Sequence, residues 1–152
     1  MALPDIFSKD VCDTIVARVN KLTPQLASQW GKMNVAQMLA HSNVTYELVY
    51  TNKHKTPGML MKFILKSFIK KNIVNEVPYK NNLRTAPAFI IADEREFNTE
   101  KKRLLEFIDK TRQLGRSHFE GKESHSFGKL TAQEWNNLFY KHLDHHLTQF
   151  GA

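Results

Sequence analysis

The sequence predicts an all-α protein, an up-and-down bundle of about four long helices with one shorter helical partner. Three observations support this fold class. Apolar residues recur at helical spacing in five segments, no segment has the alternation of a convincing strand, and no internal repeat or Gly/Ser-rich linker divides the chain. We therefore expect a single domain over residues 1–152, a length that one hydrophobic core can serve.

The first two helices are predicted on either side of Pro24. Apolar residues recur at intervals of four through residues 10–22, which indicates an amphipathic helix. Pro24 interrupts the pattern because proline lacks a backbone N–H. Asn34 is a favourable N-cap for a second helix that runs to about residue 50. Apolar residues lie on both sides of this second helix, so we expect most of its circumference to be buried.

A third helix is expected from residue 59 to about residue 74. It begins after Pro57 and Gly58 and carries a row of lysines, Lys62, Lys66 and Lys70, among apolar residues. Lysines at intervals of four share one face of a helix, and such a row is typical of the solvated side.

A long connection without helical period follows, over residues 75–97. It contains Pro78 and Pro87 and only a short apolar run. Ordered connections of this length are uncommon and tend to be lids or binding loops. Tyr79 and Arg84 are therefore candidates to close over a substrate or to contact an anion, although both side chains also fit an ordinary loop.

Two further helices complete the predicted bundle. Asn98 is expected to cap a fourth helix that ends near residue 114, with Gly115 as its stop signal. The last helix is the clearest, because Thr131 and Glu134 have the spacing of a capping box and Gly151 follows the apolar run.

Two histidines lie in the middle of the apolar stripe of the last helix. On a helical wheel, His142 and His146 fall about 20° to either side of Trp135. Being four residues apart, they lie one turn apart on one surface, where both imidazoles can reach one ion. A buried histidine is more often a hydrogen-bonded core residue, but a shared cation would keep both rings uncharged and satisfy one nitrogen of each.

The third ligand is expected from the second helix. His41 lies there among apolar residues and is directed inward. Side chains from facing helices build the metal sites of helical bundles, and three histidines with one open position are common in catalytic zinc sites. The remaining histidines, His54, His118 and His125, lie in charged stretches and are interpreted as solvated loop residues.

Three polar residues near these histidines are candidates to orient the ligands or a bound molecule. Gln37 lies one turn before His41, and Gln149 and His145 border the histidine stripe of the last helix. A plain structural role is an equal alternative for both glutamines. No Asp or Glu falls on the histidine face of either helix, so no general base is named.

Three stretches of the chain resemble a known family. They are Trp30–His41 (WGKMNVAQMLAH), Phe127–Trp135 (FGKLTAQEW) and His142–Gly151 (HLDHHLTQFG). They resemble the DinB/YfiT-like metalloenzyme superfamily, and are most similar to a branch known only as a domain of unknown function. The similarity covers most of the chain, including residues 84–87.

The resemblance implies a DinB-like four-helix bundle whose three histidines bind a divalent metal. One of these ligands comes from the second long helix and two, four residues apart, from the last helix, which match His41, His142 and His146. Some relatives look like S-transferases that use low-molecular-weight thiols, and others like hydrolases or isomerases. The resemblance therefore implies the site more sharply than the substrate.

The leading hypothesis is a divalent-metal-dependent enzyme of hydrolase or thiol S-transferase type. Zinc or nickel would be held by the three histidines with an open coordination position, and the substrate would be a small molecule, for example a low-molecular-weight thiol. A third hypothesis, ranked after the charge-based one described next, keeps the metal but makes it purely structural, with His145 as the spare ligand. The sequence leaves open whether the protein forms a homodimer.

The second hypothesis, the main alternative to the enzyme, rests on charge. The chain has 22 Lys and Arg against 15 Asp and Glu, a net charge of +7. A non-enzymatic basic protein could use the lysine row to bind nucleic acid or an anionic membrane surface. No zinc finger, basic region or aromatic RNA-binding signature accompanies the row, which makes nucleic acid the less favoured partner.

Cysteine content and hydropathy indicate the compartment. Cys12 is the single cysteine, which excludes an internal disulfide framework and a multi-cysteine zinc site and leaves an all-nitrogen protein ligand set. The first residues have no apolar signal segment, and no run of about 18 apolar residues occurs. We therefore expect a cytoplasmic protein without a transmembrane segment.

Overall fold

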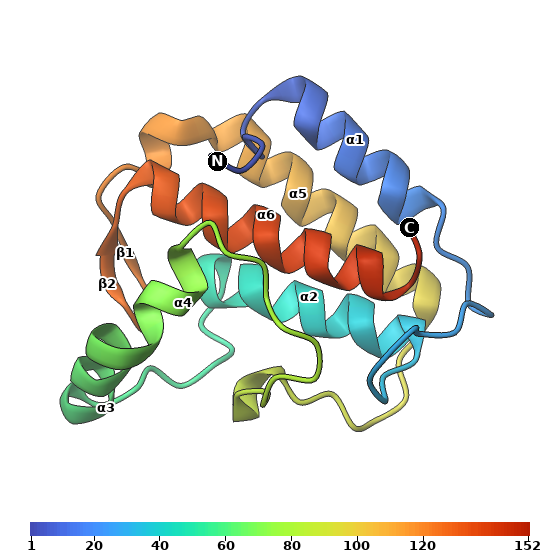
Figure 1. Ribbon diagram of the computed structural model, residues 1–152, viewed down its shortest axis with the longest axis horizontal. Helices are drawn as coiled ribbons and strands as arrows, with labels where there is room; N and C mark the ends of the chain where they lie inside the picture. Colours follow the sequence, from blue (N-terminus) through green and yellow to red (C-terminus); the bar gives the residue numbers. More distant parts are fainter.

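The computed structural model describes all 152 residues as a mostly helical protein with one small two-stranded sheet. Four long helices lie side by side, and contacts join α2 to α5, α1 to α5, and α6 to all three of the others (Figure 1). Their bounds are α1 Lys9–Asn20, α2 Val35–Tyr50, α5 Phe97–Phe119 and α6 Ala132–Gln149.

Both predicted capping signals for α2 and α6 are confirmed. The Asn34 side chain accepts from the backbone N–H of Gln37 at 2.8 Å, and the Gln37 side chain accepts from the backbone N–H of Asn34 at 3.0 Å. Thr131 and Glu134 form the same reciprocal pair at 3.1 and 3.0 Å. These boxes fix where the two helices begin, and hence the rotation of the faces that carry His41 and His142.

The fourth predicted helix, α5, differs from its prediction at both ends. Its N-cap is Glu96 and not Asn98, because the Glu96 carboxylate accepts from the backbone N–H groups of Asn98 and Thr99 at 3.1 and 2.6 Å. Gly115 interrupts the helix as expected, with φ +72°, but the chain resumes a helical turn and ends at Phe119. Glycine tolerates this left-handed backbone without the steric cost of a side chain.

A β-hairpin between α5 and α6 was not predicted. Its strands, β1 Lys122–Ser124 and β2 Gly128–Leu130, pair antiparallel. The Ser124 hydroxyl closes the turn, donating to the Gly128 carbonyl at 2.7 Å and accepting from the Phe127 N–H at 2.9 Å. Strands of three residues are too short to give a readable alternation, so the expectation of a purely helical chain was wrong here.

The third predicted helix forms over the expected residues but with an unexpected orientation. It comprises α3 Met59–Ile64, a π-helical turn η1 Leu65–Ile69 and α4 Lys70–Val74. Lys70 faces the protein and pairs with Glu134 at 2.8 Å, whereas Phe63 and Phe68 are 66% and 70% exposed. The interpretation of the lysine row as the solvated side was therefore wrong for Lys70 and holds for the exposed Lys66. Tertiary packing also turned apolar side chains of the same helix to solvent.

The core lies between the long helices. Twelve of the sixteen residues of α2 are buried, which confirms the expectation for this helix. Tyr46 of α2 stacks between Phe107 of α5 and Phe139 of α6, with ring centroids 5.6 and 5.1 Å apart. This packing holds the facing sides of α2 and α6 at a fixed separation, which positions any site built between them.

The connection over residues 75–96 is irregular except for one 3₁₀ turn, η2 Pro87–Phe89. In Figure 1 it crosses in front of α2 and then runs below it, and η2 contacts α2. No helix combines the length and the hydropathy that a membrane span requires.

Candidate metal centre

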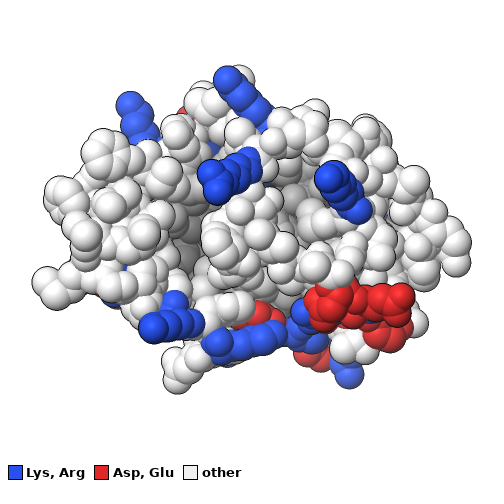
Figure 2. Space-filling view, turned by 90° about the horizontal axis from the view of Figure 1, so that it is seen from below, with Lys and Arg blue, Asp and Glu red and all other residues white.

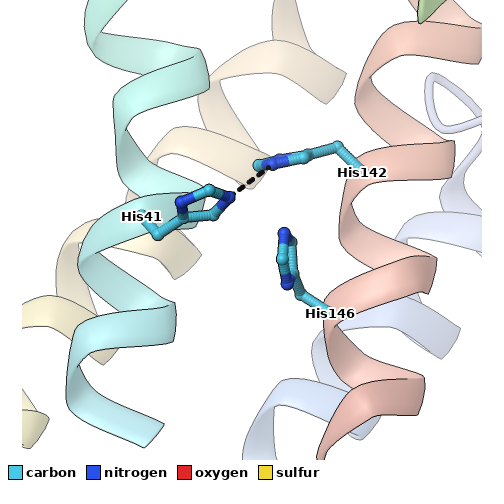
Figure 3. Close-up of side chains that lie close together, drawn as sticks. All are labelled: His41, His142 and His146. Carbon is cyan, nitrogen blue, oxygen red and sulfur yellow. Dashed lines mark hydrogen bonds between the residues drawn. The ribbon is translucent and has the colours of Figure 1, made fainter. Parts of the chain in front are cut away.

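His41, His142 and His146 converge between α2 and α6 (Figure 3). One ring nitrogen of each lies within 4.8 Å of those of the other two, and the Nε2 atoms of His41 and His142 are 3.1 Å apart. His41 and His146 are buried and His142 is half-buried. The three residues that the sequence singled out as ligands are thus brought together, although 101 positions separate His41 from His142.

The outer nitrogen of each ring has its own hydrogen-bond partner. His41 Nδ1 lies 2.8 Å from the Phe89 carbonyl oxygen in η2, and His142 Nδ1 lies 3.0 Å from the Thr45 hydroxyl. His146 Nδ1 lies 2.8 Å from Gln149 Oε1. Such partners hold an imidazole in one orientation, as they do around metal-bound histidines.

These partners determine which ring nitrogens carry hydrogen. A carbonyl oxygen only accepts, so His41 Nδ1 is the donor to Phe89. Gln149 donates its amide N–H to the Trp30 carbonyl at 2.7 Å, which turns its oxygen toward His146 and makes His146 Nδ1 a donor too. In the neutral rings the Nε2 atom of each of these two residues therefore carries a lone pair, and both lone pairs face the shared centre.

Burial disfavours a proton at this centre. Burial is the main cause that lowers the pKa of His41 and His142 below 6.5, and neighbouring histidines lower that of His142 further. Burial, together with the electrostatic effect of His41, lowers the pKa of His146 to about 3. At 3.1 Å, a His142 ring protonated on Nε2 donates a hydrogen bond to the Nε2 lone pair of His41, while the Thr45 hydroxyl donates to His142 Nδ1. A cation at this centre would take the place of that hydrogen bond and leave all three rings neutral.

Of the predicted orienting residues, Gln149 contacts a ligand and Gln37 does not. The Gln37 side chain is engaged in the α2 capping box and donates to the Asp93 carbonyl at 3.2 Å. Thr45 and the Phe89 carbonyl perform this role instead. Thr45 lies four residues after His41, so helical spacing could have identified it, whereas a backbone carbonyl in an irregular segment leaves no sequence signal.

His145 lies beside the three-histidine cluster but outside it. Its ring packs on His146, Trp30 and Tyr79, with centroids 5.0, 5.6 and 5.7 Å apart. Burial raises the pKa of the Tyr79 phenol above its usual range, and its ring lies under the ammonium of Lys141 at 4.6 Å. Tyr79 therefore belongs to an aromatic wall next to the cluster.

The three histidines interpreted as loop residues have different environments. His118 is exposed near the end of α5, and His125 lies in the turn of the hairpin. His54 was misjudged, because its ring lies 2.7 Å from the carboxylate of Glu47, which is only 2% exposed. Burial alone would raise the pKa of Glu47, but hydrogen bonds from Arg103, His54 and Lys53 lower it to about 2.

The cluster opens into a cavity of about 900 Å³, within the size range of small-molecule sites. Half of the wall comes from apolar side chains, including Leu65 and Ile69 of η1, and no Asp or Glu contributes to it. The basic residues in the wall are Lys32, Lys80 and Arg84. Both predicted lid residues, Tyr79 and Arg84, thus line the cavity that contains the three histidines.

Gly31 allows the chain to approach Gln149 closely. Its φ of +81° is rarely adopted by other residues, and an added Cβ would lie 2.7 Å from Gln149 Nε2. A side chain here would displace the amide that orients His146. The adjacent Trp30 and Gly31 therefore both shape this side of the site.

Comparison with known proteins identifies one family. Its description is "Protein of unknown function (DUF1569)", and its profile matches residues 7–152, a range that includes all three histidines and the lining of the cavity. No curated protein and no solved structure matched the chain. Because the match spans nearly the whole sequence, the chain belongs to the DUF1569 family.

Proposed function

We propose that this protein is a divalent-metal-dependent enzyme and that His41, His142 and His146 hold the ion through their Nε2 atoms. The observation that carries this proposal is the pairing of each Nδ1 with an oxygen while one nitrogen of each ring lies within 4.8 Å of the other two. Neutral imidazoles suit zinc and nickel, the two ions that we propose.

The proposed reaction is a hydrolysis or a transfer to a thiol. When bound, such an ion lowers the pKa of a water to about 7 or activates a thiolate. The chain's own contribution is to orient the rings through Gln149, Thr45 and the Phe89 carbonyl and to surround the reacting group with apolar walls. No carboxylate lines the cavity, so we assign no general base.

The charge of the cavity wall favours an anionic small-molecule substrate. Lys32, Lys80 and Arg84 are its charged side chains, with no acidic residue to oppose them. A low-molecular-weight thiol that carries carboxylates fits this chemistry. We propose that Tyr79 and Arg84, both in the 75–96 connection, close over such a substrate.

An open coordination position is more consistent with the surroundings than a purely structural site. His145 is the spare histidine nearby, but it is not part of the cluster and its ring packs against that of His146. A structural zinc site requires four protein ligands. The three-histidine set instead leaves room for a substrate.

We further propose that the fold is an up-and-down four-helix bundle of DinB type within the DinB/YfiT-like superfamily. Support comes from the side-by-side packing of α1, α2, α5 and α6 and from the origin of the ligands, one on the second long helix and two on the last. The one cysteine, Cys12, is buried and unpaired, which suits the reducing cytoplasm that we propose as the compartment.

Metal content tests the proposed function. Protein purified without a histidine tag should carry a stoichiometric divalent ion, and the double variant His142→Ala, His146→Ala should lose it. The matched control is His118→Ala, His125→Ala, which also removes two histidines but leaves the cluster intact. Equal metal in wild type and in the folded cluster variant would contradict the proposal.

A turnover assay separates the two reaction types. The metal-loaded protein would be offered activated esters and alkyl halides, with and without a low-molecular-weight thiol. Turnover that requires the thiol indicates a transferase, and turnover without it indicates a hydrolase. Either activity should disappear in the His142→Ala, His146→Ala variant.

A further inference from the structure

The entire net charge of the protein comes from one segment. Residues 48–92 contain eight of the 22 basic and one of the 15 acidic side chains, a net charge of +7. The remaining 14 basic and 14 acidic side chains cancel. The segment comprises the end of α2, the loop 51–58, the third predicted helix, residues 59–74, and most of the connection that follows it.

The same segment carries nearly all of the exposed apolar surface. Ten of the eleven large hydrophobic residues that are exposed lie between positions 59 and 90, and the other is Met1. Within the helix they are Met59, Leu60, Met61, Phe63, Ile64, Phe68 and Ile69. A soluble monomer rarely exposes so many neighbouring apolar side chains unless they contact a partner or a membrane. We refer to residues 59–74 as the apolar helix.

The apolar helix has one outward face and one face on the cavity. Its start, α3, protrudes from the body of the protein in Figure 1 and continues directly into η1. Leu65, Ile69 and Ile73 line the cavity that contains the histidines. Leu83 and Ile90 of the connection line the same cavity and are 57% and 59% exposed. The exposed apolar surface is therefore continuous with the mouth of the cavity.

Figure 2 looks onto the underside of the molecule, where the connection and α3 lie. Lys and Arg side chains are scattered around a hollow on this face, and Asp and Glu gather at one corner. The segment that carries this positive charge is also the one that exposes the apolar side chains. Interfacial helices of peripheral membrane proteins combine these two properties.

We propose that the apolar helix docks the protein onto an anionic lipid bilayer, with its outward apolar side chains in the acyl boundary and the surrounding lysines at the lipid phosphates. The mouth of the cavity then faces the lipid surface. This inference rests on exposure and charge and does not depend on the metal.

Two other partners fit these observations less well. The phosphates of a nucleic acid would bind the positively charged side chains, but they offer no apolar surface to contact the exposed Met, Leu and Ile side chains. A second copy joined through this face would bring two segments of charge +7 together, which is unfavourable. An anionic bilayer satisfies both the apolar and the basic side chains.

Vesicle binding of the full-length protein tests the proposal. We expect it to co-sediment with phosphatidylcholine vesicles that contain phosphatidylglycerol and not with pure phosphatidylcholine vesicles, and added salt should weaken the binding. Two triple variants, Leu60→Gln, Phe63→Gln, Phe68→Gln and Lys55→Gln, Lys66→Gln, Lys71→Gln, should each lower the partition coefficient by roughly tenfold or more. Circular dichroism verifies that each variant is folded.

A control variant removes the same charge from another face. Lys21→Gln, Lys102→Gln, Lys110→Gln neutralises three exposed lysines of or next to α1 and α5, and its vesicle binding should stay within about twofold of wild type if location matters. The proposal is overturned by no binding to anionic vesicles at low salt, or by equal losses in the control and the Lys55 variant. Dimerisation abolished by the Leu60 variant, or tighter binding to duplex DNA than to vesicles, also overturns it.

Discussion

Gln149 links the proposed metal site to the backbone of the loop before α2, at Trp30. It accepts from His146 Nδ1 at 2.8 Å and donates to the Trp30 carbonyl at 2.7 Å. Both groups of its amide are thus used, and the orientation of the His146 ring depends on it. Residues that hold metal ligands in this way typically contribute a factor of 10–100 to metal affinity.

Gln149→Ala is therefore predicted to weaken zinc binding by roughly 10- to 100-fold, because the His146 ring loses its fixed orientation. Competition with a chromogenic chelator measures the affinity. Gln37→Ala is the matched control, since that glutamine caps α2 and contacts no ligand. Equal zinc affinities in the two variants would show that Gln149 does not position the ligand.

The buried histidines also predict how stability depends on pH. The pKa of His146 is lowered from 6.5 to about 3 in the folded protein, chiefly by burial. The unfolded chain therefore binds the proton more readily, and stability falls as the pH drops below 6.5 and continues to fall toward about 3. The pKa values of His41 and His142 are also lowered in the folded protein, so these two residues likewise make the protein less stable as the pH falls.

For the metal-free protein, we expect the free energy of unfolding to fall by about 2 kcal/mol from this histidine between pH 7 and pH 5. Urea denaturation at a series of pH values measures it. His146→Gln removes this titrating group and should make the pH dependence shallower by about that amount, while the contributions of His41 and His142 persist. The same slope in wild type and variant would refute the assignment.

At the scale of elements, the start of α6 decides where two of the three proposed ligands lie. The Thr131 side chain accepts from the Glu134 N–H, so it stabilises the first turn of the helix that carries His142 and His146. Thr131→Ala should cost about 1 kcal/mol and lower Tm by about 2–4 °C. Thermal denaturation measures this, with the exposed loop variant Thr56→Ala as the control. Equal Tm values in both variants would contradict the capping role.

Elements specified by local signals were predictable from the sequence, and those specified by packing were not. The boxes at Asn34 and Thr131 depend on neighbours three residues away, so both helix starts were correct. The predicted N-cap of α5 was wrong. Asn98 was chosen because asparagine is favoured at N-caps, but the carboxylate of Glu96 takes this role in the structure. The helical spacing of apolar residues predicted the apolar helix itself. The side that this helix turns toward the protein depends on tertiary contacts, such as the ion pair of Lys70 with Glu134.

The same distinction applies to the candidate site. His142 and His146 were recognisable because they lie in the middle of a local apolar stripe, and His41 because α2 is buried on most sides. The Phe89 carbonyl was not recognisable, because its direction is set by the course of an irregular connection. Sequence patterns thus indicated the candidate ligands, whereas part of their hydrogen-bonded support could be found only in the folded chain.

For the whole molecule, a metal bound at this centre would join distant parts of the chain. His41 lies on α2, and His142 and His146 lie on α6, so the ion would bind the folded state and not the unfolded chain. Such a ligand stabilises by about 2.7 kcal/mol when its free concentration is 100 times its Kd. For a domain of this size, that corresponds to a rise in Tm of about 5–10 °C.

We therefore predict that zinc raises the Tm of the metal-free protein by about 5–10 °C and that a chelator reverses the rise. His145→Ala should keep the effect, because that ring lies outside the cluster, whereas His142→Ala should lose it. Differential scanning fluorimetry at several zinc concentrations gives the comparison. A rise in Tm of the same size in both variants would mean that zinc stabilises the protein at another place, and the three histidines would then be core residues without a metal.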